Sequence, residues 1–402
     1  MRKLRRPLGA ISVVIVAALA VTMGASGSAS ADPTFPTWSD VLKAKHNAAA
    51  KKAEIKKLTA LIVSLQNSAA EAGKTALERG EEYLEAKSAL QQATTTADQL
   101  SNQADTADAK AKASSREASL LAAQLAREGS GDLTLQLVLD GYHASDLLDV
   151  LGTINKLGDQ SSKLFAQAQQ DRKTAKALSD QASIAESDRA TKATAAKSAL
   201  AAANAAAATA QSRVSSQTKE QKVLTAQLAS LNNVSAATEA GYYAGVAWEA
   251  KQAAQKAPPA DGVPPGPIPG VPDGSKVATA IHFAEAQVGK PYKLDGAGPT
   301  YWDCSGLTLK AYAAAGVYIG THSATNQYNT LKSENRLVPL SERQPGDILW
   351  YSDGGSTSGT KYHVTLYIGN GQMIEAPYPG VNVRIAAVRF GDLVPFAGRP
   401  TG

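Results

Sequence analysis

Apolar residues recur at helical spacing along much of the N-terminal part of this 402-residue chain. Proline is absent from residues 37–257, where alanine, lysine, glutamate, glutamine, serine and leucine dominate; this composition favours long helix. One seam of apolar residues steps by three, four and three positions, at Ile55, Leu58, Ile62 and Leu65. Such a seam predicts a coiled coil.

The helical pattern breaks at the Gly-Ser-Gly sequence of residues 129–131, and the residues that follow are much more apolar. We therefore expect residues 32–257 to form an all-α antiparallel coiled-coil hairpin, with arms at 38–128 and 160–256 and an apolar tip near 130–158. At 1.5 Å per residue, each arm would be about 135 to 145 Å long. The tip either closes the hairpin as a hydrophobic plug or docks a partner, and the sequence leaves both possibilities open.

The N-terminus is typical of an export signal. Basic residues precede an apolar run at 11–21, and Ala29-Ser30-Ala31 provides a small-residue cleavage site. We predict a signal peptide at residues 1–31 and a secreted, extracytoplasmic mature protein. Arg5-Arg6 leaves the export route open between the general secretory and twin-arginine pathways. Removing the four basic residues of 1–31 lowers the formal charge from +5 to +1 (5 − 4 = 1), so the basic pI does not indicate nucleic-acid binding.

A second domain follows a proline-rich linker at residues 258–274. Residues 275–402 have an ordinary single-domain length. Their pattern predicts a helix at 276–288, a second helix beginning at Cys304, and then strands at 348–351, 364–368, 372–376 and 382–385. Helices followed by an antiparallel sheet predict an α+β fold.

Cys304 is the only cysteine of the chain and cannot form an internal disulfide. Leu307, Ala311 and Gly316 place it in the first turn of a helix, with Asp303 as the N-cap. The positive end of a helix dipole favours thiolate over thiol, which makes the cysteine a candidate nucleophile. The alternative is a buried cysteine that acts as a small hydrophobic residue.

A cysteine nucleophile needs a base, and five histidines are available. His46 and His143 fall in the coiled region, His282 on a helix surface, and His322 in a loop or a cleft wall. His363 stands at the start of a strand, with Glu375 across the turn that contains Asn370-Gly371. A two-residue turn would pair Glu375 with Leu366 on the wrong face of the sheet. We therefore predict a three-residue bulged loop with Gly371 left-handed, which pairs Glu375 with Thr365 and brings it near His363.

The segments 303–307, 344–349 and 363–377 together resemble the NlpC-type cysteine peptidases, over about the last 125 residues. The resemblance implies a papain-like fold with Cys304 as nucleophile, His363 as base and Glu375 as the orienting residue. It also implies that Tyr292 stabilises the oxyanion and that Asp303 and Ser305 border the substrate cleft. The family usually has an aromatic residue and a glycine pair where residues 293–295 read Lys-Leu-Asp, so subsite details are not transferred.

The order of signal peptide, coiled hairpin, linker and peptidase resembles secreted hydrolases of Gram-positive, actinobacterial type. The resemblance implies a peptidoglycan D,L-endopeptidase that cuts the D-glutamyl to diamino-acid bond, needs no metal or other cofactor, and is restrained by its coiled coil. In some such proteins the coiled coil docks on the extracellular part of the FtsE-FtsX membrane complex. The alternatives are a wall amidase or acyltransferase on a similar Cys-His scaffold, and a non-catalytic wall-binding adaptor.

Overall fold

A computed structural model describes residues 37–128, 144–233, 236, 240 and 270–402. The predicted signal peptide, the tip as far as residue 143, His143 and most of the linker lie outside these residues. Within the described segments, no helix is both long enough and apolar enough to cross a membrane.

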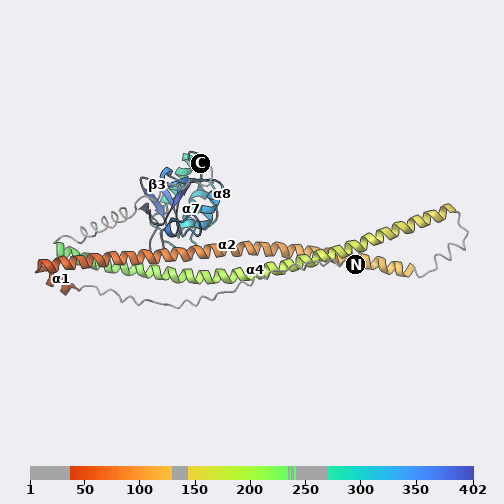
Figure 1. Ribbon diagram of the computed structural model, residues 1–402, viewed down its shortest axis with the longest axis horizontal. Helices are drawn as coiled ribbons and strands as arrows, with labels where there is room; N and C mark the ends of the chain where they lie inside the picture. Colours follow the sequence, from red (N-terminus) through yellow and green to blue (C-terminus); the bar gives the residue numbers. More distant parts are fainter. Residues whose placement is uncertain (1–36, 129–143, 234–235, 237–239, 241–269) are drawn as a thin grey trace, which may run out of the picture.

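Three helices form a long two-stranded rod (Figure 1). The short helix α1 (Trp38–Lys45) is closed at its start by a capping box between Thr37 and Asp40. The chain turns at His46 and enters α2 (Ala48–Glu128). Helix α4 (Ala144–Asn232) runs antiparallel to α2 and packs along it. The returning helix begins at Ala144, well before the expected residue 160, so the latter half of the predicted tip is helix. No proline lies between Ala144 and residue 160, so the helix can begin early and continue into the arm.

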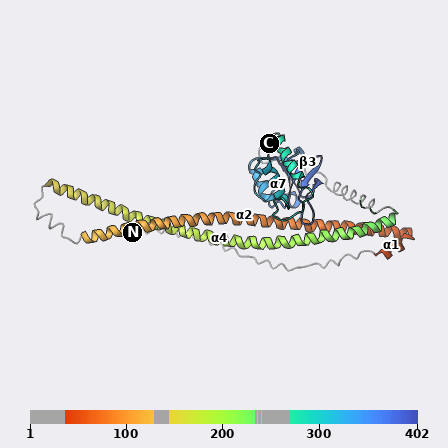
Figure 2. The same cartoon turned by 180° about the vertical axis from the view of Figure 1, so that it is seen from behind.

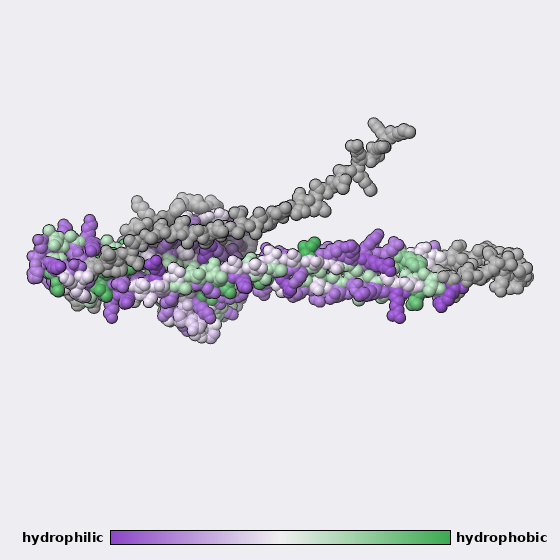
Figure 3. Space-filling model, turned by 90° about the horizontal axis from the view of Figure 1, so that it is seen from below, coloured by the Kyte–Doolittle hydropathy of each residue, from purple (hydrophilic) through white to green (hydrophobic). Residues whose placement is uncertain are grey.

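The rod is held by apolar packing at its base and by small residues further along. Leu58 and Ile62 of the predicted seam are buried against α4, in a cluster completed by Val41, Ala44, Leu224, Leu228 and Leu231. Ala203 and Ala210 are fully buried in the middle of the rod, so the two backbones approach closely there. The face of the rod seen in Figure 3 is mostly hydrophilic, with scattered apolar patches.

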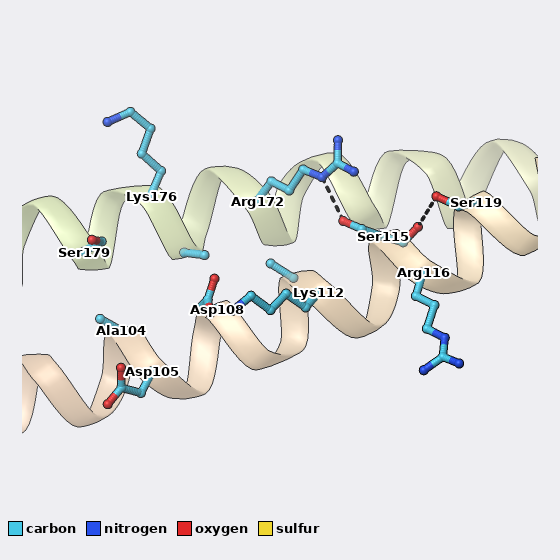
Figure 4. A pocket seen from close by; sticks show the side chains of 12 residues that line it. Ala104, Asp105, Asp108, Lys112, Ser115, Arg116, Ser119, Arg172, Lys176 and Ser179 are labelled. Atoms are coloured by element: carbon cyan, nitrogen blue, oxygen red, sulfur yellow. Dashed lines mark hydrogen bonds and ion pairs between the residues drawn. The ribbon is translucent and has the colours of Figure 1, made fainter.

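Towards the tip the two helices diverge (Figures 1 and 2). A hollow of about 810 Å³ opens between them, lined mainly by charged and small polar side chains (Figure 4). Arg172 crosses it, its Nε donating to Ser115 Oγ at 2.8 Å. Polar contacts therefore accompany a seam of small buried alanines, such as Ala111 and Ala175, in this part of the rod.

The C-terminal domain has three helices and one antiparallel sheet. The helices are α6 (Gly274–Glu285), α7 (Cys304–Ala314) and α8 (Ala324–Ser333). The sheet order is β1-β6-β2-β3-β4-β5, and the strands are β1 (Leu337–Pro339), β2 (Ile348–Tyr351), β3 (His363–Gly369), β4 (Gln372–Glu375), β5 (Arg384–Ala387) and β6 (Leu393–Gly398). Two short 3₁₀ turns, η1 (Leu340–Glu342) and η2 (Asp353–Gly355), follow β1 and β2. The predicted α+β fold is confirmed, whereas α8, β1 and β6 were not predicted.

The β3–β4 hairpin has the predicted register but a different loop. Leu366 pairs with Ile374, which sets Glu375 at the level of Thr365 as expected. The loop itself has two residues, Asn370 and Gly371, both with positive φ, and the register shift falls between Tyr367 and Gly369 at the end of β3. The bulge therefore lies in the strand rather than in the loop.

The C-terminal domain lies against α2 near the base of the rod in both views (Figures 1 and 2). At Gly73 the approach is close, because a Cβ built there would lie 2.6 to 2.8 Å from ring atoms of Tyr378. Leu77, one helical turn further on, is 5% exposed and belongs to the same buried cluster as Cys304. One face of α2 therefore packs directly on the domain.

Candidate active site

The start of α7 holds Cys304 in place. Asp303 is the N-cap of the helix, as predicted, and its Oδ1 accepts the N–H of Gly306 at 2.7 Å. Cys304 packs in the same buried cluster as Val364 of β3, and the backbone N–H groups of Val364 and Ser305 act to lower the pKa of its thiol. Because Val364 directly follows His363 on β3, this packing brings Cys304 to the strand that carries the predicted base.

His363 and Glu375 form a buried pair. His363 Nε2 lies 2.9 Å from Glu375 Oε2, and both side chains are almost completely buried. His363 Nδ1 has no hydrogen-bond partner. With Nε2–H donating to the carboxylate, Nδ1 carries the free lone pair, and that nitrogen can take a proton from the neighbouring thiol. His363 and Glu375 thus form one buried pair, next to the strand residue Val364 that shares a cluster with Cys304, and the catalytic roles of the three residues stay predictions.

Two arginines that the sequence reasoning missed also hold Glu375. Arg389 Nη1 and Nη2 donate to the two carboxylate oxygens at 2.8 and 2.7 Å, and Arg384 Nε donates at 3.0 Å. Although burial acts to raise the pKa of Glu375, Arg389 and His363 hold it well below its usual range. Glu375 is therefore a fixed anion. Arg384 of β5 stands directly opposite Glu375 of β4. A register assigned to these two strands from the sequence would therefore have identified Arg384.

The expected thiolate is not favoured in this conformation. Burial, together with the negative charges of Asp303 and Glu81, raises the pKa of Cys304 well above its ordinary value. Burial likewise lowers the pKa of His363 despite the neighbouring Glu375. The resting pair is thus a neutral thiol and a neutral imidazole. Any stabilisation of a thiolate by the start of α7 is outweighed because burial, to which α2 contributes, excludes water from the site.

The remaining predicted site residues surround Cys304. Tyr292 is half-buried, and burial and the charges of Cys304 and Asp303 raise its pKa, so it lies beside the sulfur. Asp303 and Ser305 are buried and bonded to each other, Ser305 Oγ donating to Asp303 Oδ1 at 3.2 Å. Their role at the border of the substrate cleft stays a prediction, as does the oxyanion role of Tyr292.

His322 is the second histidine near the cysteine helix. Its Nε2 lies 2.8 and 2.9 Å from the two carboxylate oxygens of Asp303. On its other side, Nδ1 lies 3.5 Å from Asp295, which is also paired with Lys87 of the rod. His322 therefore lies in the loop before α8, where it joins the N-cap of α7 to the surface that meets α2.

This network predicts a pH dependence of stability. Burial lowers the pKa of His322, but the hydrogen bond and charge of Asp303, helped by Asp295 and opposed by Lys87, raise it above 6.5 overall. A raised pKa contributes stability below the unfolded value, and this contribution is lost as pH rises through the folded value. We expect His322→Gln to remove a pH-dependent contribution on the order of 1 kcal/mol.

Urea unfolding of the full chain at pH 5.5 and pH 8.5 measures this effect. The loss in the His322→Gln variant should be larger at pH 5.5 than at pH 8.5. The matched control is His282→Gln, because His282 is exposed and pairs only with Glu285 on its own helix. An equal loss for His322→Gln at both pH values would contradict the prediction.

Two further histidines lie among the described residues, both outside the surroundings of Cys304. His46 follows α1 at the base of the rod, and His282 lies on the surface of α6. Among the residues whose placement is described, no group of three or more His, Cys, Asp or Glu side chains is arranged to hold a metal ion.

The NlpC/P60 family matches residues 289–398, the segment that carries Cys304, His363 and Glu375. The C-terminal domain is an NlpC/P60 domain. Its relatives include the peptidoglycan endopeptidase RipA of Mycobacterium tuberculosis, 36% identical over 132 residues that cover 30% of this chain and 26% of RipA. RipB of the same species is 38% identical over 136 residues, 31% of this chain and 52% of RipB. The chain thus matches between a quarter and about half of the length of these relatives.

Among solved structures, the NlpC/P60 domain is similar to the peptidoglycan hydrolase RipB of M. tuberculosis, with 34% identity, a TM-score of 0.27, and coverage of 32% of this chain and 66% of that one. It is also similar to the P60 domain of an antigen of M. avium subspecies paratuberculosis, with 31% identity, a TM-score of 0.27, and coverage of 32% and 96%.

Helix α2 covers the cleft of the NlpC/P60 domain. Leu77 packs into the cluster that contains Cys304, and Lys74 forms ion pairs with Asp392 at 2.8 Å and Asp353 at 2.6 Å. Beside His363 a hollow of about 330 Å³ remains between the domain and α2, lined in part by Lys74, Leu77, Tyr378, Arg384 and Arg389. The rod therefore contributes to the burial of Cys304 and forms one wall of the hollow beside His363.

Proposed function

We propose that the protein is a secreted peptidoglycan D,L-endopeptidase that cleaves the D-glutamyl to diamino-acid bond of stem peptides. The observation that carries the proposal is the arrangement of His363. Glu375 holds its Nε2, its Nδ1 has no hydrogen-bond partner, and the next residue of β3, Val364, packs in the same buried cluster as Cys304. The peptidoglycan endopeptidases RipA and RipB, as relatives of the domain, support the choice of substrate.

The mechanism starts when the rod leaves the cleft and water returns to the site. His363 Nδ1 takes the thiol proton as the sulfur of Cys304 attacks the γ-carbonyl carbon of the D-glutamyl residue. The resulting oxyanion accepts hydrogen bonds from the backbone N–H of Cys304 and the hydroxyl of Tyr292. The imidazolium then gives its proton to the leaving amine, and the C–N bond breaks to leave a thioester on Cys304.

Water completes the reaction. His363 accepts a proton from a water molecule that attacks the thioester carbonyl, and the sulfur leaves as the acid product forms. Glu375 keeps the imidazole in one tautomer throughout, and Arg389 prevents Glu375 from taking the proton itself because it holds the carboxylate in its charged form.

We also propose that the rod restrains this activity until a partner lifts it. The support is the packing of Leu77 and Lys74 over the cleft and the raised pKa of the buried Cys304. A membrane complex of the FtsE-FtsX type is the partner implied by the resemblance, and neither the contacts described above nor the relatives bear on it.

Digestion of purified peptidoglycan tests the cleaved bond. We expect mass spectrometry of the soluble products to contain fragments that begin with a free amino group on the diamino acid, with the D-glutamyl residue at the new carboxyl end of the other fragment. Release of whole stem peptides that begin with L-alanine would instead identify an amidase, and the proposal would fail.

A further inference from the structure

A buried carboxylate lies directly beside the proposed nucleophile. Asp303 is 1% exposed and precedes Cys304 in the chain. Its Oδ1 accepts from the Gly306 N–H at 2.7 Å and from the Ser305 hydroxyl at 3.2 Å. A helix cap needs only an oxygen acceptor, which asparagine or serine would supply without a charge. The charge itself works against the nucleophile, because burial raises the pKa of the Cys304 thiol and the charge of Asp303 raises it further.

His322 is placed to offset that charge. Its Nε2 lies within 2.9 Å of both carboxylate oxygens of Asp303. A Cβ built at Gly306 would lie 2.8 Å from the same nitrogen, so the ring lies against the first turn of α7. Burial acts to lower the pKa of His322, but Asp303 and Asp295 together raise it above its ordinary value of 6.5. An imidazolium ion in contact with a carboxylate forms a pair without net charge.

The rod affects how much positive charge His322 carries. Lys87 of α2 pairs with Asp295, the carboxylate on the other side of the ring, and its positive charge acts to lower the pKa of His322. When the rod is lifted, Lys87 leaves, water reaches the ring, and Asp295 is left to His322 alone. Each of these changes favours the imidazolium ion.

Glu81 is the other charged residue of the rod that faces this site. Its carboxylate is 2% exposed. It accepts hydrogen bonds from three donors at the start of α8, which are the Ser323 hydroxyl and the N–H groups of Ala324 at 3.1 Å and Thr325 at 2.9 Å. Glu81 also raises the pKa of Cys304, and it leaves with the rod. Of these two carboxylates, only Asp303 remains in the uncovered site, with His322 as its counter-ion.

We propose that His322 is a positioning residue for the nucleophile and acts through Asp303. As an imidazolium ion it neutralises Asp303, and so favours the Cys304 thiolate over the thiol once the rod has left the cleft. The inference rests on the proposed function, in which Cys304 attacks the stem peptide and His363 is the base. Loss of His322 should therefore change the ionisation of Cys304 and leave the covalent chemistry in place.

The pH dependence of Cys304 labelling by iodoacetamide tests this role on the full chain. The probe is uncharged, it reacts with the thiolate, and Cys304 is the only thiol. His322→Gln keeps a donor for Asp303 without the charge. Relative to the unsubstituted chain, we expect this variant to be labelled about tenfold more slowly at pH 6. The two rates should converge towards pH 9.5, where His322 has lost its charge and the thiol is ionised.

His322→Arg and Lys87→Gln are the matched controls. Arginine keeps a cation beside Asp303 at every pH, so most of the labelling lost at pH 6 should return. Lys87→Gln breaks the contact between the same network and the rod but keeps His322. It separates a change of ionisation from a change in how often the rod covers the cleft, and its labelling should be no slower than that of the unsubstituted chain at any pH.

The outcomes are distinct. A labelling ratio between His322→Gln and the unsubstituted chain that does not change with pH, or an equal loss in a folded His322→Arg, overturns the role of His322. If circular dichroism shows His322→Arg to be unfolded, the pH dependence of the first ratio decides alone. Labelling does not depend on which bond is cut. Absence of cleavage at the D-glutamyl bond therefore refutes the proposed function, whereas cleavage there with a constant labelling ratio refutes only the role of His322.

Discussion

Replacing Cys304 by alanine is expected to lower the rate of stem-peptide cleavage by at least about a thousandfold, because no other group in the cleft can form the covalent intermediate. Cys304 is the only cysteine of the chain. The change removes one buried sulfur at the start of α7 and leaves the N-cap bond from Asp303 to Gly306 untouched. Circular dichroism and thermal unfolding should therefore be close to those of the unsubstituted chain.

Cys304→Ser separates chemistry from packing. Serine nearly preserves the volume, but its hydroxyl is a much weaker nucleophile than a thiol, so we expect this variant to be nearly as inactive as Cys304→Ala. Glu375→Gln should lower the rate by about a hundredfold or more, because the imidazole loses its fixed orientation. Undiminished cleavage by Cys304→Ala would exclude the covalent mechanism. The necessary control is a preparation purified free of contaminating hydrolases.

The local settings of Cys304 and His363 could be predicted from sequence because both follow local rules. Asp303 caps a helix that the apolar spacing already indicates, and His363 opens a strand of alternating pattern. The position of Glu375 depended on the register between β3 and β4. We predicted the register that places Glu375 near His363, and the structure has that register. The loop was wrong in detail because a bulge near Gly369 reaches the same register as a longer turn.

The ionisation of the site could not be predicted from its own residues. The neighbourhood of Cys304 in sequence favours a thiolate, yet burial raises its pKa, and part of that burial comes from a helix more than two hundred residues earlier in the chain. One signal was present: Gly73 and Gly80 interrupt an alanine-rich helix, where each glycine costs about 1 kcal/mol relative to alanine. They lie seven residues apart on the face that meets Tyr378 and Leu294.

Lifting the rod is expected to raise both the cleavage rate and the reactivity of Cys304 by about tenfold or more. Glu81→Arg places a cation against the N-terminus of α8, where the helix dipole disfavours it. The matched control is Glu82→Arg, the same change at the next position, where the side chain is exposed and pairs only with Arg79 on its own helix. Labelling by a thiol-reactive probe reports on the site directly, since Cys304 is the only thiol.

A second pair of variants tests, without any change of charge, whether the rod covers the cleft. Gly73→Ala and Gly158→Ala should each favour helix in the rod, but only the first adds a Cβ where the Tyr378 ring lies, since nothing lies within 4 Å at Gly158. We expect Gly73→Ala to increase labelling severalfold and Gly158→Ala to leave it unchanged. Equal labelling and equal cleavage in all four variants would show that the rod does not restrain the site.

The pH dependence of the equilibrium between covered and uncovered cleft distinguishes the Glu81 contact from apolar packing of the rod alone. The pKa of Glu81 is about 7 when the rod is in place, compared with an ordinary value of 4.5. Glu81 therefore binds a proton more tightly when the rod covers the cleft than when the rod is lifted. As a result, the rod should be held on the domain most firmly below about pH 4.5 and less firmly as the pH rises towards 7. Glu81→Gln keeps an oxygen acceptor without the charge, and it should hold the rod in place at pH 7 at least as firmly as glutamate does. A reactive cysteine in Glu81→Arg and a protected one in Glu81→Gln would mean that the charge at this position, more than its volume, decides whether the cleft is open.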